Sequence, residues 1–238
     1  MIEKVTEIFQ QEANAILGIP VNDSFESATR LIHRRVHEMG GKLVTSGMGK
    51  AGEIAQNIST TFSSTGTPAV YLHPSEAQHG DLGLIQPNDV LMLVSNSGKT
   101  REILELVGLV QRLHKGLPMI MITGNPESEL AEIVDVCILT GNPREVCPLG
   151  LSPTTSTTVM TVIGDALIVL MMDKIGFTNE DYAKRHHGGY LGSKSREQAN
   201  QKIQPGLVEH SKNESGSYLI SNHWSLQFIS TRPAFQTL

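Results

Sequence analysis

Two periods of hydrophobic and polar residues alternate along this chain. Apolar residues at helical spacing predict two helices over residues 2–17 and 23–39, and Gly40-Gly41 ends the second pattern. Five short apolar runs bounded by turn residues follow at 42–45, 69–72, 90–94, 119–123 and 134–139. Helix-length segments separate most of these runs, near residues 51–64, 100–115 and 127–133. Apolar runs without polar alternation, spaced in this way, are typical of parallel strands that are covered on both faces.

The right-handed crossover rule then predicts an α/β fold, a three-layer α/β/α sandwich with about five parallel strands. A long apolar helix is expected over residues 154–175 and a shorter one near 178–185. From about Ser193 the composition shifts to Ser, Asn, Gln, Lys and Glu. We therefore expect one domain over residues 1–193, which includes the N-terminal helices, and a C-terminal tail over 194–238 that has no assigned structure.

Composition and charge narrow the class of protein. The 238 residues include 19 Lys and Arg against 24 Asp and Glu, and the net charge of -5 argues against nucleic acid or an anionic membrane as the main partner. No apolar run is expected to reach the roughly 20 residues that span a bilayer, and the N-terminus shows no signal core. Cys137 and Cys147 make no disulfide framework. A cytoplasmic protein is the simplest interpretation.

The loop after the first apolar run carries candidate anion-binding residues. Ser46-Gly47-Met48-Gly49-Lys50 places two glycines and a lysine at a helix start, where backbone N–H groups can approach an anion. The segment is neither a P-loop nor a dinucleotide-binding fingerprint. A tight turn with a surface lysine remains the alternative.

A second candidate phosphate site follows the third apolar run. Ser95, Ser97 and Thr100 surround Gly98 at a predicted helix N-terminus, where both hydroxyl groups and the helix dipole favour phosphate. An ordinary N-cap would explain one hydroxyl but not three.

Groups that can transfer protons lie in other loops. Glu145 precedes the hydroxyl run 154–158, and a carboxylate and an imidazole near a phosphate site suit proton transfer on a sugar phosphate. His186 is placed on a predicted loop. His73 and His79 are six residues apart with acids between them, but no zinc-binding spacing is present, so no dedicated metal site is expected.

Seven motifs in this order resemble the sugar isomerase (SIS) domain family, and within it the enzymes that isomerise arabinose 5-phosphate. The motifs span about residues 40–193 and read SGMGK, STGTP, HPSEAQHGDLG, SNSGKT, EVCPLGLSPTTSTT, GDAL and HHGGYLG. The resemblance implies a flavodoxin-like sheet and the reversible conversion of D-ribulose 5-phosphate into D-arabinose 5-phosphate through a cis-enediol. It also implies a role in supplying Kdo, lipopolysaccharide or capsule synthesis. No cofactor is required by this chemistry.

The same resemblance assigns roles to individual residues. Lys50, Glu145 and His186 match catalytically important positions: Glu145 as the enediol base, His186 in ring opening or proton shuttling, and Lys50 at the developing oxyanion. The roles of Glu145 and His186 could be exchanged. The positions matched to substrate binding are Gly66, Thr67, His73, His79, Ser95, Ser97 and Thr100. His73 can also meet an inhibitory metal.

Two features depart from the usual pattern of these enzymes. Lys99 stands where they carry Glu after SNSG, and we hypothesise that this cation contributes to catalysis by stabilising phosphate or enediolate. Many relatives continue into a tandem CBS pair of about 120 residues, so the residues after Ser193 predict a single-domain form. Relatives also form tetramers in which the residue matching His186 reaches a neighbour's site, which implies a homotetramer here.

Two alternative functions remain at this stage. One is an isomerase of another sugar phosphate, such as a hexulose 6-phosphate. The other is a sensor without catalysis, because SIS domains also serve as sugar-phosphate sensors fused to DNA-binding domains. The first 40 or so residues are too few for such a DNA-binding domain and are not basic. Retention of Lys50, Glu145 and His186 also favours the isomerase.

Overall fold

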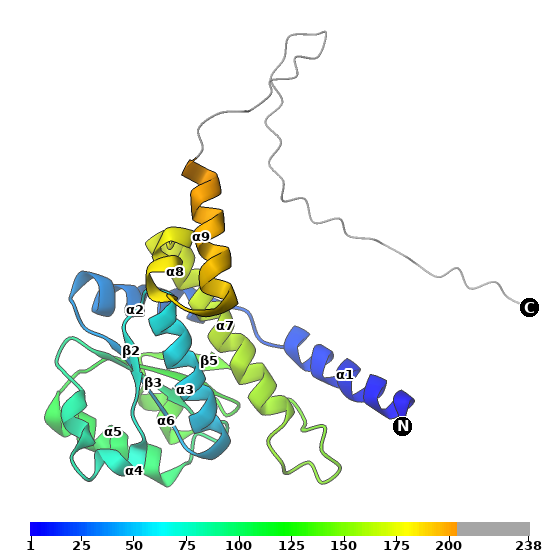
Figure 1. Ribbon diagram of the computed structural model, residues 1–238. Helices are drawn as coiled ribbons and strands as arrows, with labels where there is room; N and C mark the ends of the chain where they lie inside the picture. Colours follow the sequence, from blue (N-terminus) through cyan, green and yellow to red (C-terminus); the bar gives the residue numbers. More distant parts are fainter. Residues whose placement is uncertain (204–238) are drawn as a thin grey trace, which may run out of the picture. The chain divides into compact units, whose positions relative to one another are not determined.

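A parallel five-stranded sheet forms the centre of the protein in the computed structural model, which describes residues 1–203 (Figure 1). The strands are β1 (Leu43–Gly47), β2 (Ala69–Tyr71), β3 (Val90–Val94), β4 (Met119–Thr123) and β5 (Val136–Leu139). They are ordered β2-β1-β3-β4-β5, and every neighbouring pair is parallel. This confirms the predicted fold class. Each observed strand coincides with one of the five apolar runs to within two residues at either end.

Helices surround this sheet. They are α1 (Ile2–Leu17), α2 (Ser24–Ile32), the π-helix η1 (His33–Glu38), α3 (Gly49–Ser64), α4 (Pro74–Ala77), the 3-10 helix η2 (Asp81–Leu84), α5 (Arg101–Leu113), α6 (Glu129–Ile133), α7 (Thr155–Ile175), α8 (Asn179–Arg185) and α9 (Gly189–Ile203). The helix expected over 23–39 is thus α-helical only to Ile32 and continues as a π-helix. The short elements α4 and η2 lie in the loop after β2, where the sequence predicted no helix.

Two hydrophobic cores lie on opposite faces of the sheet, because successive strand residues point to opposite sides. In β3, Met92 belongs to the core that α2, α3 and α7 complete. Its neighbours Leu91 and Leu93 belong to the core that α4, α5 and α6 complete. All five residues of β3 are fully buried, which explains the absence of polar alternation in that run.

Helix α7 lies in the first of these cores. At 21 residues it is long and apolar enough to cross a membrane by length and composition, which corrects the expectation that no segment reaches those limits. Half of its apolar stretch is buried inside the fold, where Ile163 and Leu167 are fully covered. Gly164 lets α3 approach closely, because a Cβ at that position would overlap Ile58. In this structure α7 is therefore a core helix.

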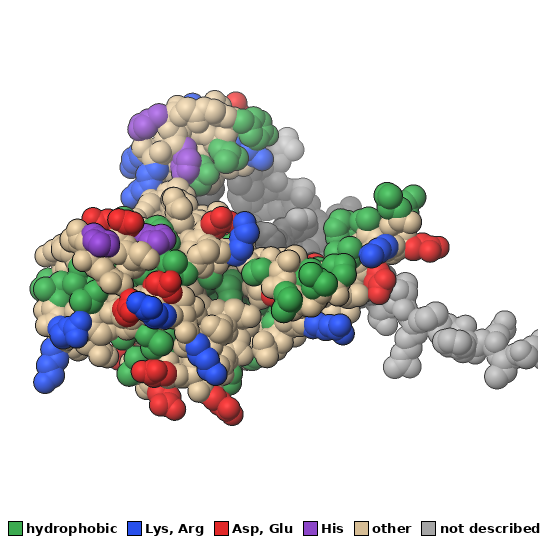
Figure 2. All heavy atoms as spheres, turned by 90° about the horizontal axis from the view of Figure 1, so that it is seen from below, with side chains coloured by type: hydrophobic (Ala, Val, Ile, Leu, Met, Phe, Trp, Pro, Cys, Tyr) green, Lys and Arg blue, Asp and Glu red, His purple; other side chains and the backbone are tan. Residues whose placement is uncertain are grey.

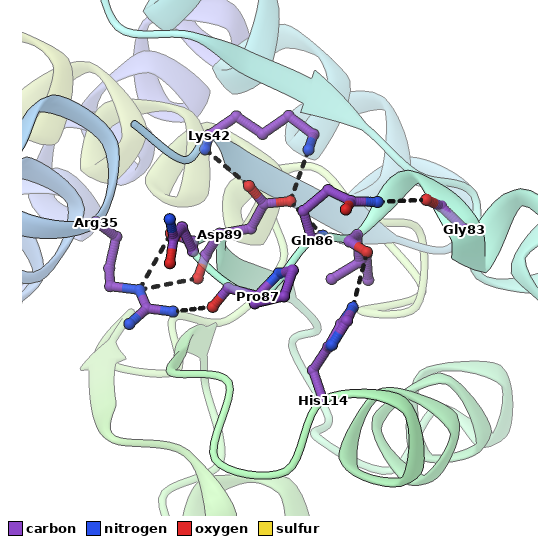
Figure 3. Close-up of polar contacts among 9 residues, drawn as sticks. Arg35, Lys42, Gly83, Gln86, Pro87, Asp89 and His114 are labelled. Carbon is purple, nitrogen blue, oxygen red and sulfur yellow. Dashed lines mark hydrogen bonds and ion pairs between the residues drawn. The ribbon is translucent and has the colours of Figure 1, made fainter. Parts of the chain in front are cut away.

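A polar network joins the segment before β1 to the turn before β3 (Figure 3). The buried Asp89 carboxylate accepts hydrogen bonds from the backbone N–H groups of Lys42 and Gln86, and it pairs with Lys42 Nζ at 2.7 Å. The Arg35 guanidinium donates to backbone carbonyls of residues 87–89. This network lies before β1 and β3 and so at the amino ends of the strands, away from the edge where ligands are expected.

The chain beyond α8 forms part of the same compact unit, which extends to Gln201. Helix α9 continues through Ser193, the position at which the composition shifts. The boundary expected there stays a prediction. Residues 204–238, most of the tail predicted from the sequence, lie outside the described residues.

Candidate functional site

A cleft of about 930 Å³ opens at the carboxyl ends of the strands. Its walls come from the loops after β1, β3, β4 and β5 and from the first turns of α7. The polar lining residues are Lys50, Ser95, Asn96, Ser97, Thr100, Asn125, Glu127, Asn142, Arg144, Glu145, Ser156 and Thr157. This volume lies within the usual range for small-molecule sites.

The topology of the sheet explains the place of the cleft. From β1 the chain passes through α3 on one face to β2, and from β3 it passes through α5 on the other face to β4. Neighbouring loops therefore diverge above β1 and β3 and leave a crevice between them. The first two loops that the sequence singled out follow these two strands, and both line the cleft.

The loop between β3 and α5 presents hydrogen-bond donors to the cleft. The hydroxyl groups of Ser95 and Thr100 lie 3.0 Å apart, and the Ser97 hydroxyl accepts from the Lys99 amide. Asn125 fixes the same loop, because its side-chain amide donates to the Ser97 carbonyl at 3.0 Å. The first N–H groups of α5 have no acceptor within the helix. Hydroxyl and amide donors thus converge at the positive end of a helix dipole, as an anion site requires.

Gly98 is needed for this loop to form. Its φ of +63° lies in the left-handed region, which side chains with a Cβ adopt only with strain. A Cβ on Gly98 would also overlap the Ser128 hydroxyl, which belongs to the N-cap of α6. The glycine therefore allows the loops after β3 and β4 to pack against each other.

Glu145 is anchored to the first turn of α7. One carboxylate oxygen, Oε2, accepts hydrogen bonds from the Thr154 amide at 2.8 Å, the Thr154 hydroxyl at 2.9 Å and the Ser156 amide at 3.2 Å. The other oxygen, Oε1, makes no hydrogen bond with any residue from 1 to 203 and is free to meet a ligand. Because Glu145 itself lines the cleft, one oxygen positions the group while the other can act.

The environment of Glu145 also sets its charge. Partial burial by itself would raise the pKa of the carboxyl, but hydrogen bonds from Ser156 and Thr154, through side chain and backbone alike, outweigh it and lower the pKa. Glu145 is therefore a carboxylate at neutral pH, the protonation state that a general base needs.

Two cations line the same cleft. Lys50 lies in the first turn of α3, and its ammonium is 3.3 Å from the exposed Glu53 carboxylate, an ion pair that holds it only weakly. Arg144 directly precedes Glu145 and is exposed. The cleft therefore combines a loop of hydrogen-bond donors that suits an anion, two cations and an ionised carboxylate.

The histidines predicted after β2 lie at the same edge of the sheet but outside the cleft lining. His73 forms the N-cap of α4, contacts the Tyr71 ring edge-on, and has a buried Nδ1 without a hydrogen-bond partner among the described residues. His79 is exposed. Within residues 1–203, no three His, Cys, Asp or Glu side chains are grouped so that they could hold a metal ion.

A second group of predicted residues lies at the opposite end of α3. Gly66 and Thr67 follow this helix, while Lys50 lies in its first turn; 16 residues of helix span about 24 Å. Phe177 packs against Gly66 and against the Tyr182 ring edge, and Tyr182 stacks on His186 at 3.8 Å between ring centres. The chain therefore places His186 toward Gly66 and away from the Lys50 end of α3.

Lys99 is exposed in the loop before α5 and does not line the cleft, although its neighbours Ser97 and Thr100 do. Conversely, the sequence analysis missed Asn96, Asn125, Glu127 and Arg144. Asn125 and Glu127 follow β4, and the rule that ligands bind at the carboxyl ends of parallel strands would have pointed to that loop.

Comparison with known proteins places these features in a family. The family model of the SIS domain matches residues 40–170. Arabinose 5-phosphate isomerase KdsD from Shigella flexneri is 49% identical over 196 residues, which cover 78% of this chain. This chain spans only 58% of the length of that enzyme.

Two solved structures are similar over nearly their whole length. A Bacteroides fragilis protein, described as a candidate phosphosugar isomerase involved in capsule formation, is 64% identical with a TM-score of 0.79, and the match covers 80% of this chain and 99% of that one. An Escherichia coli CFT073 protein in complex with arabinose 5-phosphate is 34% identical with a TM-score of 0.70, and the match covers 78% and 96% of the two chains.

Proposed function

This chain belongs to the SIS domain family, and from that premise we propose that it is an aldose–ketose isomerase that interconverts D-arabinose 5-phosphate and D-ribulose 5-phosphate. The observation that carries the proposal is the pairing, in one cleft, of an anion-binding loop with a carboxylate that is ionised and has one free oxygen. The Shigella flexneri relative acts on this sugar phosphate by its name, and the Escherichia coli relative holds it in its structure.

The phosphate group is assigned to the loop between β3 and α5. Ser95, Ser97 and Thr100 supply hydroxyl donors there, and the N-terminus of α5 supplies amides and a favourable dipole. A pentose 5-phosphate bound in this way presents its first two carbons at the far end of a five-carbon chain. Glu145 and Lys50 line other parts of the same cleft wall and are assigned to these carbons.

The reaction then moves one proton between neighbouring carbons. Glu145 Oε1 removes the proton from C2 of the aldose, and the C–H electron pair forms the C1–C2 double bond of a cis-enediolate. The negative charge develops on O1, where the Lys50 ammonium stabilises it. Transfer of the C2 hydroxyl proton to O1 and return of the carbon-bound proton to C1 give the ketose. Atoms and electrons balance without a cofactor.

His186 enters this scheme through a second copy of the chain. Gly66, Thr67 and His186 lie toward the opposite end of α3 from Lys50, so one copy does not present both groups to one substrate. Association of copies would place the group that contains His186 beside a neighbour's cleft. We infer a homo-oligomer, a homotetramer by family resemblance, in which His186 assists ring opening or proton shuttling across the interface.

The place of the reaction in metabolism follows from its product. An arabinose phosphate made in this cleft would serve synthesis of cell-surface sugars, and the Bacteroides fragilis relative is described as involved in capsule formation. We assign the protein to the cytoplasm on the same grounds, because phosphorylated sugars are handled there before polymer assembly.

A direct assay tests the proposal. Purified protein is incubated with D-arabinose 5-phosphate and EDTA, and ribulose 5-phosphate is measured. We expect turnover by the native chain and a loss of about 10²-fold or more in Glu145→Gln, because removal of a general base costs that much. Glu132→Gln, an exposed carboxylate on α6, is the control and keeps full turnover.

The alternatives give different results in the same experiment. Thermal stabilisation by D-arabinose 5-phosphate without turnover would overturn the isomerase and indicate a sensor. Turnover of a hexulose 6-phosphate but not of the pentose phosphate would assign the other substrate. Full activity of Glu145→Gln would contradict the role of this carboxylate and leave the isomerase intact.

A further inference from the structure

A chain of hydrogen bonds connects helix α1 to the residue that follows Glu145. The Thr155 hydroxyl donates to Glu12 Oε1 at 2.9 Å, and the same oxygen of Thr155 accepts from the Val146 amide at 3.1 Å. Glu12 lies on α1, and Thr155 is the first residue of α7, 143 positions later in the chain. Thr155 lies in the EVCPLGLSPTTSTT motif together with Glu145, but the proposed mechanism gives no role to Thr155 or to Glu12.

The geometry of the Thr155 hydroxyl group determines which atoms donate and which accept in this series of hydrogen bonds. A threonine hydroxyl has one hydrogen to donate and two lone pairs to accept with. Glu12 Oε1 takes that hydrogen, so the lone pairs of Thr155 Oγ1 face the Val146 amide. The amide belongs to the peptide bond that joins Glu145 to Val146. The hydrogen bond to Thr155 therefore orients this peptide bond, and with it the direction in which the Glu145 side chain leaves the backbone.

The first turn of α7 consequently holds Glu145 at two points. Thr154 and Ser156 hold its carboxylate oxygen, and Thr155, between them in sequence, holds its backbone. Thr155 is only 1% exposed, so water does not compete freely for its hydroxyl. Glu12, which lies outside the loop that contains Glu145, holds the Thr155 hydroxyl in the position where it accepts from the Val146 amide.

The second oxygen of Glu12 argues against a purely mechanical role. Oε2 is buried and has no hydrogen-bond partner in the described part of the chain. A buried acceptor without a hydrogen-bond partner reduces the stability of the fold. A contact that served only to hold α1 in place would not need such an acceptor. Glu12 nevertheless presents a carboxyl oxygen here, next to the positive end of the α7 dipole, and this oxygen accepts from the Thr155 hydroxyl.

We propose that Glu12 is a positioning residue for the isomerase reaction, which fixes the Glu145 base through the Thr155 hydroxyl and the Val146 amide. This inference rests on the proposed function of Glu145. It also makes α1 part of the catalytic apparatus, although no residue of α1 is fully buried and the helix lines no part of the cleft.

Matched pairs of variants test the proposal. Glu12→Ala and Thr155→Val remove one partner each, whereas Glu12→Gln and Thr155→Ser retain the acceptor and the hydroxyl. We expect kcat for D-arabinose 5-phosphate to fall on the order of 10- to 100-fold in the first pair, because small misplacement of a base is costly. KM changes little, since the phosphate loop is untouched. The second pair restores most of kcat.

A double-mutant cycle separates positioning from a general loss of structure. Because Glu12 acts only through Thr155, the variant Glu12→Ala/Thr155→Val is expected to lose no more kcat than Thr155→Val alone. Independent, multiplying losses would overturn the proposal, as would a kcat that follows the fall in thermal stability across the set. Glu7→Ala, an exposed carboxylate on the same helix, is the control and leaves kcat unchanged.

The inference and the proposed function can fail separately. If native protein shows no isomerase turnover, the proposed function fails, and hydrogen exchange of the Val146 amide then tests the contact itself. Slow exchange in native protein that becomes faster in Glu12→Ala supports the hydrogen-bond chain. Unchanged exchange overturns it. Normal kcat in Glu12→Ala, with an active native enzyme, overturns the positioning role alone.

Discussion

A carboxylate acts as a base only when it is ionised and has an oxygen free for the substrate. At the scale of single residues, the surroundings of Glu145 provide both conditions. The Thr154 amide, the Thr154 hydroxyl and the Ser156 amide all meet Oε2, and Oε1 makes no hydrogen bond with residues 1–203. Hydrogen bonds from Ser156 and Thr154 also lower the pKa of the group. The basicity that such a group loses is compensated by its fixed position beside the substrate.

The lowered pKa of Glu145 predicts how activity depends on pH. Since the pKa in the folded protein lies below the ordinary value, the acidic limb of kcat/KM is expected below about pH 4.3, the usual value for glutamate. Removing the Thr154 hydroxyl in Thr154→Val moves this limb upward, because one of the hydrogen bonds that lower the pKa of Glu145 is lost. The measurement is a pH profile of kcat/KM for each protein.

The same shift contributes to stability with a defined sign. A depressed folded-state pKa stabilises the fold above the unfolded pKa, and this contribution is lost as the pH falls through the folded pKa.

Thr161→Val is the control for the pH profile of Thr154→Val, because the Thr161 hydroxyl bonds only within α7. An acidic limb that is identical in Thr154→Val and native enzyme would contradict the assignment of the limb to Glu145.

At the scale of elements, the geometry of the cleft depends on where the helices begin. Helix α5 starts directly after the β3 loop, and α7 starts beside Glu145, so two positive helix ends face one cleft. The loop between β3 and α5 can make its turn only because Gly98 adopts a positive φ without a side chain.

Gly98→Ala tests this dependence on a single backbone position. We expect the KM for D-arabinose 5-phosphate to rise about 10-fold or more, because strain of about 1–2 kcal/mol and overlap with Ser128 would displace the phosphate loop. Steady-state kinetics and thermal unfolding are measured together.

Gly116→Ala is the matched control. Gly116 also has a positive φ, of +78°, but a Cβ there would meet nothing within 4 Å. It is expected to lower Tm by a few degrees, about 2–4 °C per kcal/mol, without changing KM. An unchanged KM in Gly98→Ala would show that phosphate does not bind at this loop.

At the scale of the whole molecule, α1 carries exposed apolar side chains. Ile2 is 84% exposed and Phe9 is 69% exposed, and Figure 2 shows hydrophobic atoms gathered on the projecting arm that α1 forms. Elsewhere on the face in Figure 2, acidic and basic side chains are interspersed. An amphipathic helix without a fully buried residue is what an associating chain would present.

Complementation between inactive variants tests the shared site. If one copy supplies Glu145 and a second supplies His186, then Glu145→Gln and His186→Gln are each inactive, but oligomers that contain both variants include sites with two native residues. In a two-fold arrangement, random mixing is expected to restore about a quarter of the sites. Turnover is measured after subunits are exchanged and mixed oligomers are verified.

The outcomes of this experiment are distinct. Recovery well above the sum of the separate variants supports an interface site. An absence of recovery in verified mixed oligomers would mean that Glu145 and His186 act within one copy, or that His186 is not required, and the activity of His186→Gln alone separates these two cases.

Local patterns of residues were enough to establish the class of the fold and most of the cleft. The spacing of apolar residues and the positions of turn residues are local properties, and they located all five strands. Because these strands are parallel, the loops that contain Lys50, Ser95 and Glu145 lie at one edge of the sheet. The family resemblance drawn from the seven motifs is confirmed by the SIS domain match over residues 40–170.

The grouping of residues on one surface, in contrast, came from the three-dimensional arrangement alone. Motif order does not show that Phe177 packs against Gly66 and, through Tyr182, brings His186 toward that end of α3. Nor does it show that Glu12 meets Thr155 across 143 positions. Contacts between distant parts of a chain depend on how the layers pack, and no local pattern of residues records that packing.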